Sequence, residues 1–146
     1  MSVTLEQASI IVDAVLAAGE HHGFDPLTCA VLDPGGHLVA LKRADGSGIL
    51  RAEIAIGKAW GALGMGIPTR ALAERAEHMP QFFAALAAVS GGRMVPVPGG
   101  VLIRDGGRII GAVGVSGDIS GPDEQCAVEG IVAAGLTADI GEVSGP

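Results

Sequence analysis

Two glycine-rich segments and a serine are the residues of this 146-residue chain whose types and spacing first suggest a binding site. Gly99-Gly100 precedes one apolar run. Residues 114–117, with Ser116 among them, lie at the end of a second apolar run. Glycines leave backbone N–H groups exposed and let a ligand come close to the backbone. We therefore predict that these amides are the main donors to an anionic or carbonyl group of a ligand, with the Ser116 hydroxyl beside them.

Three charged side chains could add chemistry to this site, namely Lys58, Arg43 and Asp123. Lys58 would supply a compact positive charge to a ligand, and we expect Lys58→Met to weaken binding about tenfold or more with little change in thermal stability. In the alternative hypothesis, the three residues perform acid–base or electrostatic work on a small organic acid. The predicted ligand-binding residues are Lys58, Gly99, Gly100, Gly114, Ser116 and Gly117.

The sequence does not contain the common motifs for dinucleotide binding, for a nucleophilic serine or for metal binding. The spacing of Gly111, Gly114 and Gly117 differs from the dinucleotide-binding fingerprint. Ser116 does not lie in a Gly-x-Ser-x-Gly motif, so a nucleophilic role is not expected. The four histidines show no ligand spacing such as His-x-x-x-His, and we expect no metal site.

A predicted β-hairpin brings the two glycine-rich segments together. Residues 101–103 and 109–115 are apolar, and Asp105-Gly106-Gly107 lies between them. An Asp-Gly or Gly-Gly pair in this place favours a tight turn, because both turn residues need positive φ. Residues 109–115 contain no polar side chain, which predicts a central strand that is covered on both faces.

The rest of the chain reads as helices and a second hairpin. Apolar periodicity predicts helices over residues 5–22, 49–63, 69–76, 80–89 and 123–138, with Lys58 in the second of them. Thr4 and Gln7 fit a capping box for the first helix, and Thr69 is a candidate cap for the third. Residues 28–32 and 37–42 are predicted to form the second hairpin, and the tail to residue 146 is expected to be loose. This order predicts an α+β fold with an antiparallel sheet, in one domain over residues 1–146.

Composition excludes several classes of partner. A net charge of −7 without a basic cluster argues against nucleic acid and anionic membrane surfaces. There is no long apolar run and no basic N-terminal segment, so we expect neither a membrane span nor a secretory signal. Cys29 and Cys126 are too few for a disulfide scaffold, which predicts two free thiols and a cytoplasmic location. Hydrophobic residues make up 49% of the chain, and the mean hydropathy of +0.48 predicts a homo-oligomer.

Several segments, taken in order, resemble the GlcG/HbpS-like family, the haem-degrading domain family that includes the C-terminal domain of PduO-type proteins. The matching segments are Val31-Leu32-Asp33-Pro34-Gly35-Gly36 with Leu38-Val39-Ala40, Arg43-x-Asp45, Ala55-x-x-Lys58-Ala59, Pro98-Gly99-Gly100-Val101, residues 111–117, and Asp123-Glu124-x-Cys126-Ala127. The resemblance implies a profilin-like layered fold, with an antiparallel sheet flanked by helices, and assembly as a homo-oligomer. It also implies haem as a ligand, or a place beside glycolate, diol or aromatic catabolism. Trp60-Gly61 departs from the family, because many members carry Arg-Thr there.

Three functions remain open at this point. The first is a small-molecule binding protein that holds haem, or another compact anionic or planar ligand, at the glycine-rich end of the hairpin. The second is an enzyme that acts on a small organic acid or an aromatic catabolite through Lys58 and Arg43. The third is an oligomeric accessory subunit without a ligand of its own. A buried Lys58 that shares a pocket with an arginine would favour the first two, and an exposed Lys58 would favour the third.

Overall fold

The computed structural model describes residues 1–141, which form one antiparallel sheet and the helices around it. The helices are α1 (Leu5–His22), α2 (Arg51–Met65), α3 (Thr69–His78), α4 (Pro80–Val89) and α5 (Ser120–Ala133). The strands are β1 (Thr28–Leu32), β2 (Leu38–Arg43), β3 (Gly100–Asp105), β4 (Arg108–Ser116) and β5 (Thr137–Asp139). Their order in the sheet is β2-β1-β4-β3-β5.

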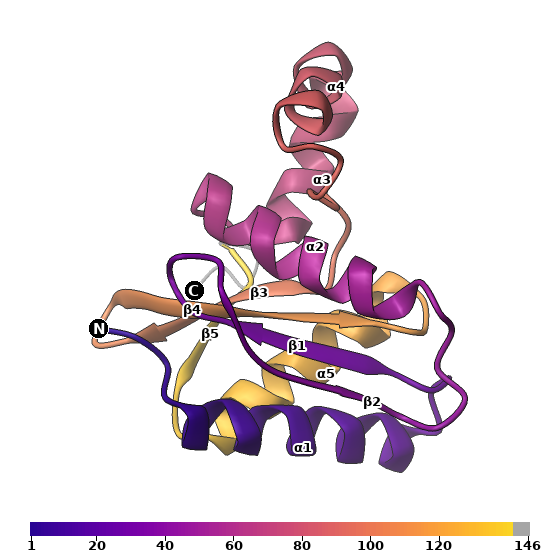
Figure 1. Ribbon diagram of the computed structural model, residues 1–146, viewed down its shortest axis with the longest axis vertical. Coiled ribbons are helices and arrows are strands. Elements are labelled where there is room, and N and C mark those ends of the chain that lie inside the picture. Colours follow the sequence, from indigo (N-terminus) through magenta and orange to yellow (C-terminus); the bar gives the residue numbers. More distant parts are fainter. Residues whose placement is uncertain (142–146) are drawn as a thin grey trace.

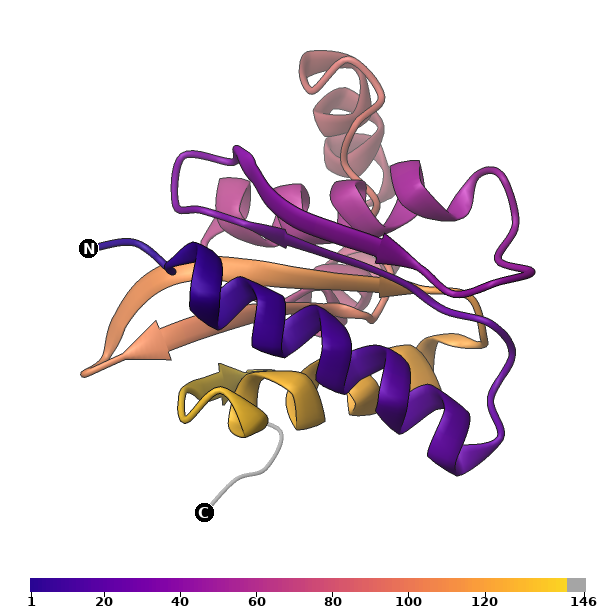
Figure 2. The ribbon, with the colours of Figure 1, turned by 60° about the horizontal axis from the view of Figure 1, so that its bottom comes forward.

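The sheet separates two layers of helix. Helices α1 and α5 lie side by side on one face, and α2 lies across the other (Figures 1 and 2). Strand β4 is central and buried over most of its length, as its uninterrupted apolar sequence predicts. The predicted α+β class, with an antiparallel sheet flanked by helices, is confirmed.

The β3–β4 hairpin forms as its turn residues predict. Gly106 and Gly107 both have positive φ, at 59° and 81°. The resulting register pairs Gly100 with Gly114, so the two glycine-rich segments meet at the open end of the hairpin. The capping box at the start of α1 also forms, since the Thr4 hydroxyl accepts from the Gln7 amide and the Gln7 side chain accepts from the Thr4 amide.

Small residues allow α2 to approach the sheet closely. A Cβ atom at Gly114 would overlap the carbonyl oxygen of Ala55, which lies on α2. A Cβ atom at Gly100 would in the same way meet the backbone carbonyl of Lys58. The two glycines therefore let the backbone of α2 contact the backbone of β3 and β4, and this contact sets the depth at which Lys58 lies.

Two sequence-based predictions about the elements are wrong. The last helix ends at Ala133 rather than at residue 138, because Gly135 takes a positive φ of 77° and stops it. The chain then forms β5, which pairs with the open edge of β3. Thr69 does not cap α3, because Pro68 occupies the cap position and the Thr69 hydroxyl bonds to both backbone groups of Gly100. The predicted loose tail lies largely outside the described residues.

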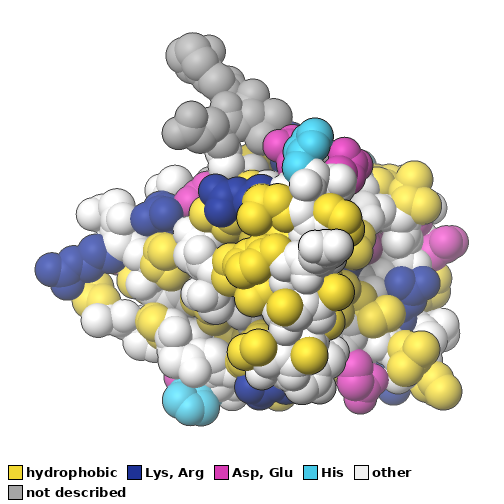
Figure 3. Space-filling model, turned by 90° about the horizontal axis from the view of Figure 1, so that it is seen from above, with side chains coloured by type: hydrophobic (Ala, Val, Ile, Leu, Met, Phe, Trp, Pro, Cys, Tyr) yellow, Lys and Arg dark blue, Asp and Glu magenta, His cyan; other side chains and the backbone are white. Residues whose placement is uncertain are grey.

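Helices α3 and α4 form an arm that extends away from the sheet (Figure 1). Helix α4 carries no charged residue, and none of its residues is buried. Hydrophobic side chains gather on the outer face of this arm (Figure 3). Within residues 1–141, no helix combines the length and the apolar character that crossing a membrane requires.

Both cysteines are free and buried. Burial raises the pKa of the Cys29 thiol far above its usual value, and burial also raises the pKa of Cys126 to about 12. We therefore expect both thiols to be unreactive towards a thiol reagent at neutral pH in the folded protein. Both should react after denaturation without reductant, which a colorimetric thiol count can measure. Fewer than two thiols in the denatured sample would reveal a disulfide.

Candidate functional site

A pocket of about 370 Å³ lies where β4 ends and where α2 and α5 begin. We call it the Lys58 pocket. Its polar lining residues are Arg51, Lys58, Ser116, Asp118, Ser120 and Asp123, and its apolar ones are Ile54, Val95, Val97 and Ile119. It therefore joins three residues that the sequence singles out, Lys58, Ser116 and Asp123, although they are far apart along the chain.

Lys58 forms a buried ion pair with Asp123. The Lys58 residue is 3% exposed and Asp123 is 1% exposed. The Lys58 ammonium donates to an Asp123 carboxylate oxygen at 3.1 Å and to the Val115 carbonyl at 2.8 Å. The other Asp123 oxygen accepts from the Asp118 amide at 3.1 Å. Both charges are thus compensated inside the protein.

Burial acts in opposite directions on the two partners of this pair. It lowers the pKa of Lys58 and raises the pKa of Asp123, because the charged form of each is poorly solvated. Each charge opposes the shift of the other by attraction. Both shifts disfavour the charged forms, and the ion pair between the two residues offsets this effect.

Arg51 is one of the pocket residues that the sequence analysis did not identify, and it carries the positive charge nearest to Ser116. It lies in the first turn of α2, and its Nη1 donates to the Ser116 hydroxyl at 3.0 Å. It forms no other side-chain hydrogen bond and no ion pair with any residue in the range 1–141. Arg51 and Lys58 are seven residues apart, about two helical turns, and so share one face of α2. That spacing is the signal that could have identified it.

Asp118 is the other carboxylate in the pocket, and its oxygens are already occupied. They accept from the backbone amides of Asp25 and Ile119, each at 2.7 Å. These backbone hydrogen bonds hold the pKa of Asp118 below its usual value, and the nearby charge of Arg51 contributes. Asp118 is not within ion-pair distance of Arg51, so most donors of that guanidinium have no partner among the described residues.

The predicted glycines lie behind the pocket rather than in its lining. The Gly100 amide donates to the Thr69 hydroxyl at 2.7 Å, and the Gly99 carbonyl accepts from the Val115 amide at 3.0 Å. A Cβ atom at Gly99 would lie 2.7 Å from the Lys58 ammonium, and one at Gly117 would overlap the Pro26 carbonyl. Of the six predicted ligand-binding residues, Lys58 and Ser116 line the pocket, while Gly99, Gly100, Gly114 and Gly117 allow close packing around it.

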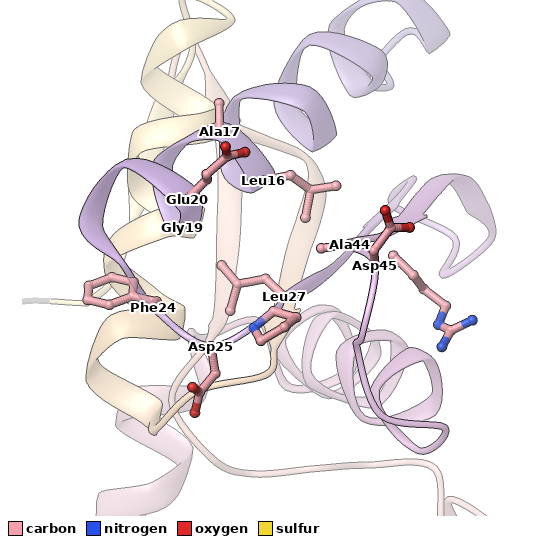
Figure 4. Close-up of a pocket in the computed structure, with 11 residues that line it drawn as sticks. Leu16, Ala17, Gly19, Glu20, Phe24, Asp25, Leu27, Ala44 and Asp45 are labelled. Atoms are coloured by element: carbon pink, nitrogen blue, oxygen red, sulfur yellow. The ribbon is translucent and has the colours of Figure 1, made fainter.

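Arg43 lines a different pocket. This cleft of about 630 Å³ lies between the end of α1, the segment that follows it, and the chain after β2. Figure 4 shows the carboxylates of Glu20, Asp25 and Asp45 around it. Arg43 donates to the Ser47 carbonyl at 2.8 Å. The structure therefore does not bring Arg43 together with Lys58, and Arg51 is the arginine of the Lys58 pocket.

Several solved structures have the same fold, and one of them is a complex with haem. The structure of HbpS is 31% identical, covers 90% of this chain and 89% of its own, and has a TM-score of 0.80. A double mutant of HbpS from Streptomyces reticuli is 30% identical, covers 90% of this chain and 86% of its own, and has a TM-score of 0.79. A complex of PduOC with haem has a TM-score of 0.84 over 93% of this chain and 97% of its own. At 22% identity, that complex shows the fold alone.

The family follows from the sequence match. None of the curated proteins matches the chain significantly. The family model described as haem-degrading protein HbpS-like matches residues 3–132, which include every residue that lines the Lys58 pocket. The resemblance inferred from the ordered motifs is thereby confirmed. The chain belongs to the HbpS-like family.

Proposed function

We propose that this protein binds a small organic molecule through a carboxylate group in the Lys58 pocket. The observation that supports this most is Arg51, whose guanidinium lines the pocket and uses one hydrogen bond, to Ser116, within the described residues. A guanidinium presents a planar fork of donors that matches the two oxygens of a carboxylate. Arg51 also lies at the start of α2, where the helix dipole favours a negative charge.

The neighbouring donors support the same ligand chemistry. An ammonium has three N–H groups, and Lys58 uses two of them for Val115 and Asp123. The Ser116 hydroxyl is buried and accepts from Arg51, so it holds the guanidinium at the pocket. Because Lys58 and Asp123 neutralise each other, Arg51 is the charge that selects the ligand, opposed in part by Asp118. The pocket thus favours one anionic group rather than a polyanion.

Haem carries propionate carboxylates, so it belongs to the ligand class of this proposal. Its family association comes from the HbpS-like match and from the haem in the PduOC structure. The lining of the Lys58 pocket contains no histidine, cysteine or methionine, and the chain has no tyrosine. The residues of this pocket therefore fit a propionate but not the iron. The Lys58 pocket is therefore proposed to bind a carboxylate, and no residue of it is assigned to the haem iron.

Arg51→Gln tests the proposal. We expect it to weaken binding of acetate about ten- to a hundredfold, because a charge-assisted hydrogen bond is lost. Amide chemical shifts of Ser116 and Asp118 can follow the titration by NMR. Arg43→Gln is the matched control and should leave the affinity unchanged. An unchanged acetate affinity in Arg51→Gln would contradict the proposal.

An enzymatic role is a second candidate, favoured by the buried Lys58–Asp123 pair. Its members have pKa shifts in opposite directions, which is a frequent property of acid–base groups. The enzyme hypothesis derived from the sequence assigned a role to Arg43, but Arg43 lines the cleft of about 630 Å³ and not the Lys58 pocket. Arg51 would take its place as the substrate anchor. Recovery of an added carboxylate unchanged after long incubation separates binding from turnover.

We propose assembly as a homo-oligomer through α4. A helix with nine apolar residues out of ten is normally buried in protein, yet Phe82 is 44% exposed and Val89 is 85% exposed. A second copy of the chain is the partner that every solution of this protein contains, and closed homo-oligomers are the commonest assemblies. The cytoplasmic location, supported by the two buried free thiols, is part of the same proposal.

Substitution of exposed apolar residues of α4 by glutamate should dissociate the oligomer. We expect Phe82→Glu/Val89→Glu to give the monomer mass of 14.5 kDa by light scattering at micromolar concentration, where the wild type gives a multiple of it. Val132 is 60% exposed on α5, on the opposite side of the sheet, so Val132→Glu is the control and should stay oligomeric. A monomeric wild type would refute the prediction.

A further inference from the structure

A carboxylate group is much smaller than the Lys58 pocket, whose volume is about 370 Å³. Arg51, held by Ser116, would bind the charge of the ligand. The lining also includes four apolar side chains to which the proposed function gives no role, namely Ile54, Val95, Val97 and Ile119. They line the same hollow as Arg51, so one small molecule can contact them and the guanidinium together.

We propose that these four side chains bind the aliphatic body of the ligand, and that Ile119 is the residue that selects for it. The ligand class is then a short aliphatic monocarboxylate, with an acidic group at one end and an unsubstituted hydrocarbon chain at the other. This inference rests on the proposed function, because it names the other end of the same ligand.

Ile54 places an apolar surface directly beside Arg51. The two residues are three positions apart on α2, and Lys58 follows four positions later, so the three side chains share one face of the helix. A carboxylate that binds Arg51 therefore lies within about one helical turn of a hydrocarbon surface. The first carbons of the ligand chain would contact Ile54.

Val95 and Val97 form a wall of the pocket that is fixed before a ligand arrives. Each is followed by a proline, Pro96 and Pro98, which fixes its own backbone φ and restricts the residue before it. The Val97 amide donates to the Val95 carbonyl at 2.9 Å, and the Val95 amide donates to the Gly57 carbonyl of α2 at 3.3 Å. A wall that is rigid in this way loses little conformational entropy when a ligand binds.

Ile119 is difficult to explain by folding alone. It occupies the N-cap position of α5, where serine, threonine, asparagine and aspartate are favoured because their side chains accept a backbone hydrogen bond. An isoleucine side chain cannot accept one, and this residue is 74% exposed, so it adds little to the hydrophobic core. A ligand in the pocket that Ile119 lines would bury part of this apolar surface.

The polar groups of the lining do not favour a second polar group on the ligand. Asp118 accepts from two backbone amides, and Asp123 accepts from Lys58 and from the Asp118 amide. The charge of Asp118 would repel a second acidic group. A hydroxyl group placed against the apolar side chains would lose its hydrogen bonds to water without replacing them. An unsubstituted chain avoids both penalties.

Calorimetric titration with acetate and butanoate tests the inference. Burial of one methylene group strengthens binding about two- to fourfold. Butanoate has two more methylene groups than acetate, so it should bind about four- to fifteenfold more tightly.

Two substitutions of Ile119 test its role in this preference. Ile119→Ser should lower the butanoate-to-acetate affinity ratio at least about twofold, and Ile119→Leu should retain the ratio because it keeps the apolar volume. Serine is a favoured N-cap residue, so Ile119→Ser should unfold at no lower urea concentration than the wild type. A changed ratio in a variant of undiminished stability cannot come from a folding defect.

Ile49→Ser is the matched control for Ile119→Ser. Ile49 is 90% exposed and lies close in sequence to the start of α2, but it is outside the lining of the Lys58 pocket. The same substitution there should leave the affinities for acetate and butanoate unchanged. Arg51→Gln should weaken both acids by the same factor, because it acts on the end that they share.

The outcomes distinguish the inference from the proposed function. If Arg51→Gln weakens acetate binding but the wild type binds butanoate no more tightly than acetate, the carboxylate site stands and the inference is overturned. If Arg51→Gln affects neither acid, the proposed function fails, and the inference fails with it. If Ile119→Ser leaves the ratio unchanged and lowers the oligomer mass in light scattering, Ile119 packs against a second copy of the chain, which also overturns the inference.

Discussion

We expect Lys58→Met to lower the free energy of unfolding by about 3–5 kcal/mol, because it leaves the Asp123 carboxylate buried without its partner. Asp123 is 1% exposed, and its remaining hydrogen bond comes from the Asp118 amide. A buried carboxylate that loses its counter-charge must either stay ionised in a poor solvent or take up a proton. Both possibilities destabilise the folded state at neutral pH.

This expectation replaces the one derived from the sequence, that Lys58→Met would leave stability nearly unchanged. That interpretation treated Lys58 as a charge facing a ligand, whereas its ammonium also holds together α2, β4 and α5 through Val115 and Asp123. A loss of ligand binding in Lys58→Met would therefore mix a local effect with a loss of fold. Arg51, which has one hydrogen bond within the described residues, is the cleaner position at which to test binding.

Urea denaturation of two lysine variants tests the prediction. Lys42 pairs with Asp13 at 2.7 Å, but their side chains are 57% and 61% exposed, so Lys42→Met should cost less than about 1 kcal/mol. The double variant Lys58→Met/Asp123→Leu should recover much of the loss, because it removes both buried charges together. If Lys58→Met were as stable as Lys42→Met, the buried pair would not be a structural element.

Gly114→Ala is expected to have the second large effect, a loss of at least about 3 kcal/mol or failure to fold. The added methyl group would overlap the Ala55 carbonyl of α2. Neither partner can move easily, because Gly114 lies in the central strand and pairs with both Ala30 of β1 and Gly100 of β3. Relief requires α2 to lift from the sheet, which would also displace Lys58 and Arg51.

Gly64→Ala is the matched control for this substitution. Gly64 lies on α2, is exposed, and has nothing within 4 Å of an added Cβ atom. Alanine is the better helix former, so this variant should gain about 0.5–1 kcal/mol of stability. Thermal or urea unfolding of both variants measures the contrast. Equal stability of Gly114→Ala and Gly64→Ala would show that α2 adapts to the extra methyl group and that Gly114 is not a packing requirement.

Local patterns in the sequence were sufficient for most of the secondary structure. The β3–β4 turn was predicted because Gly106 and Gly107 can take the positive φ that the turn demands. The start of α1 was predicted because Thr4 and Gln7 satisfy each other's backbone groups. The central place of β4 was predicted because a strand without polar side chains must be covered on both faces. Each of these rests on interactions between residues near in sequence, or on composition alone.

The site needed the tertiary structure, because its contacts join residues that are distant in sequence. The Arg51–Ser116 and Lys58–Asp123 contacts each span 65 positions, and both exist because α2 crosses β4 closely at Gly114. The sequence drew attention to the glycines, but no local pattern could say whether they face a ligand or a helix backbone. The path of the chain after α5 was undetermined for the same reason. Strand β5 forms because β3 offers an unpaired edge to it, and edge pairing between distant segments depends on where the fold brings them.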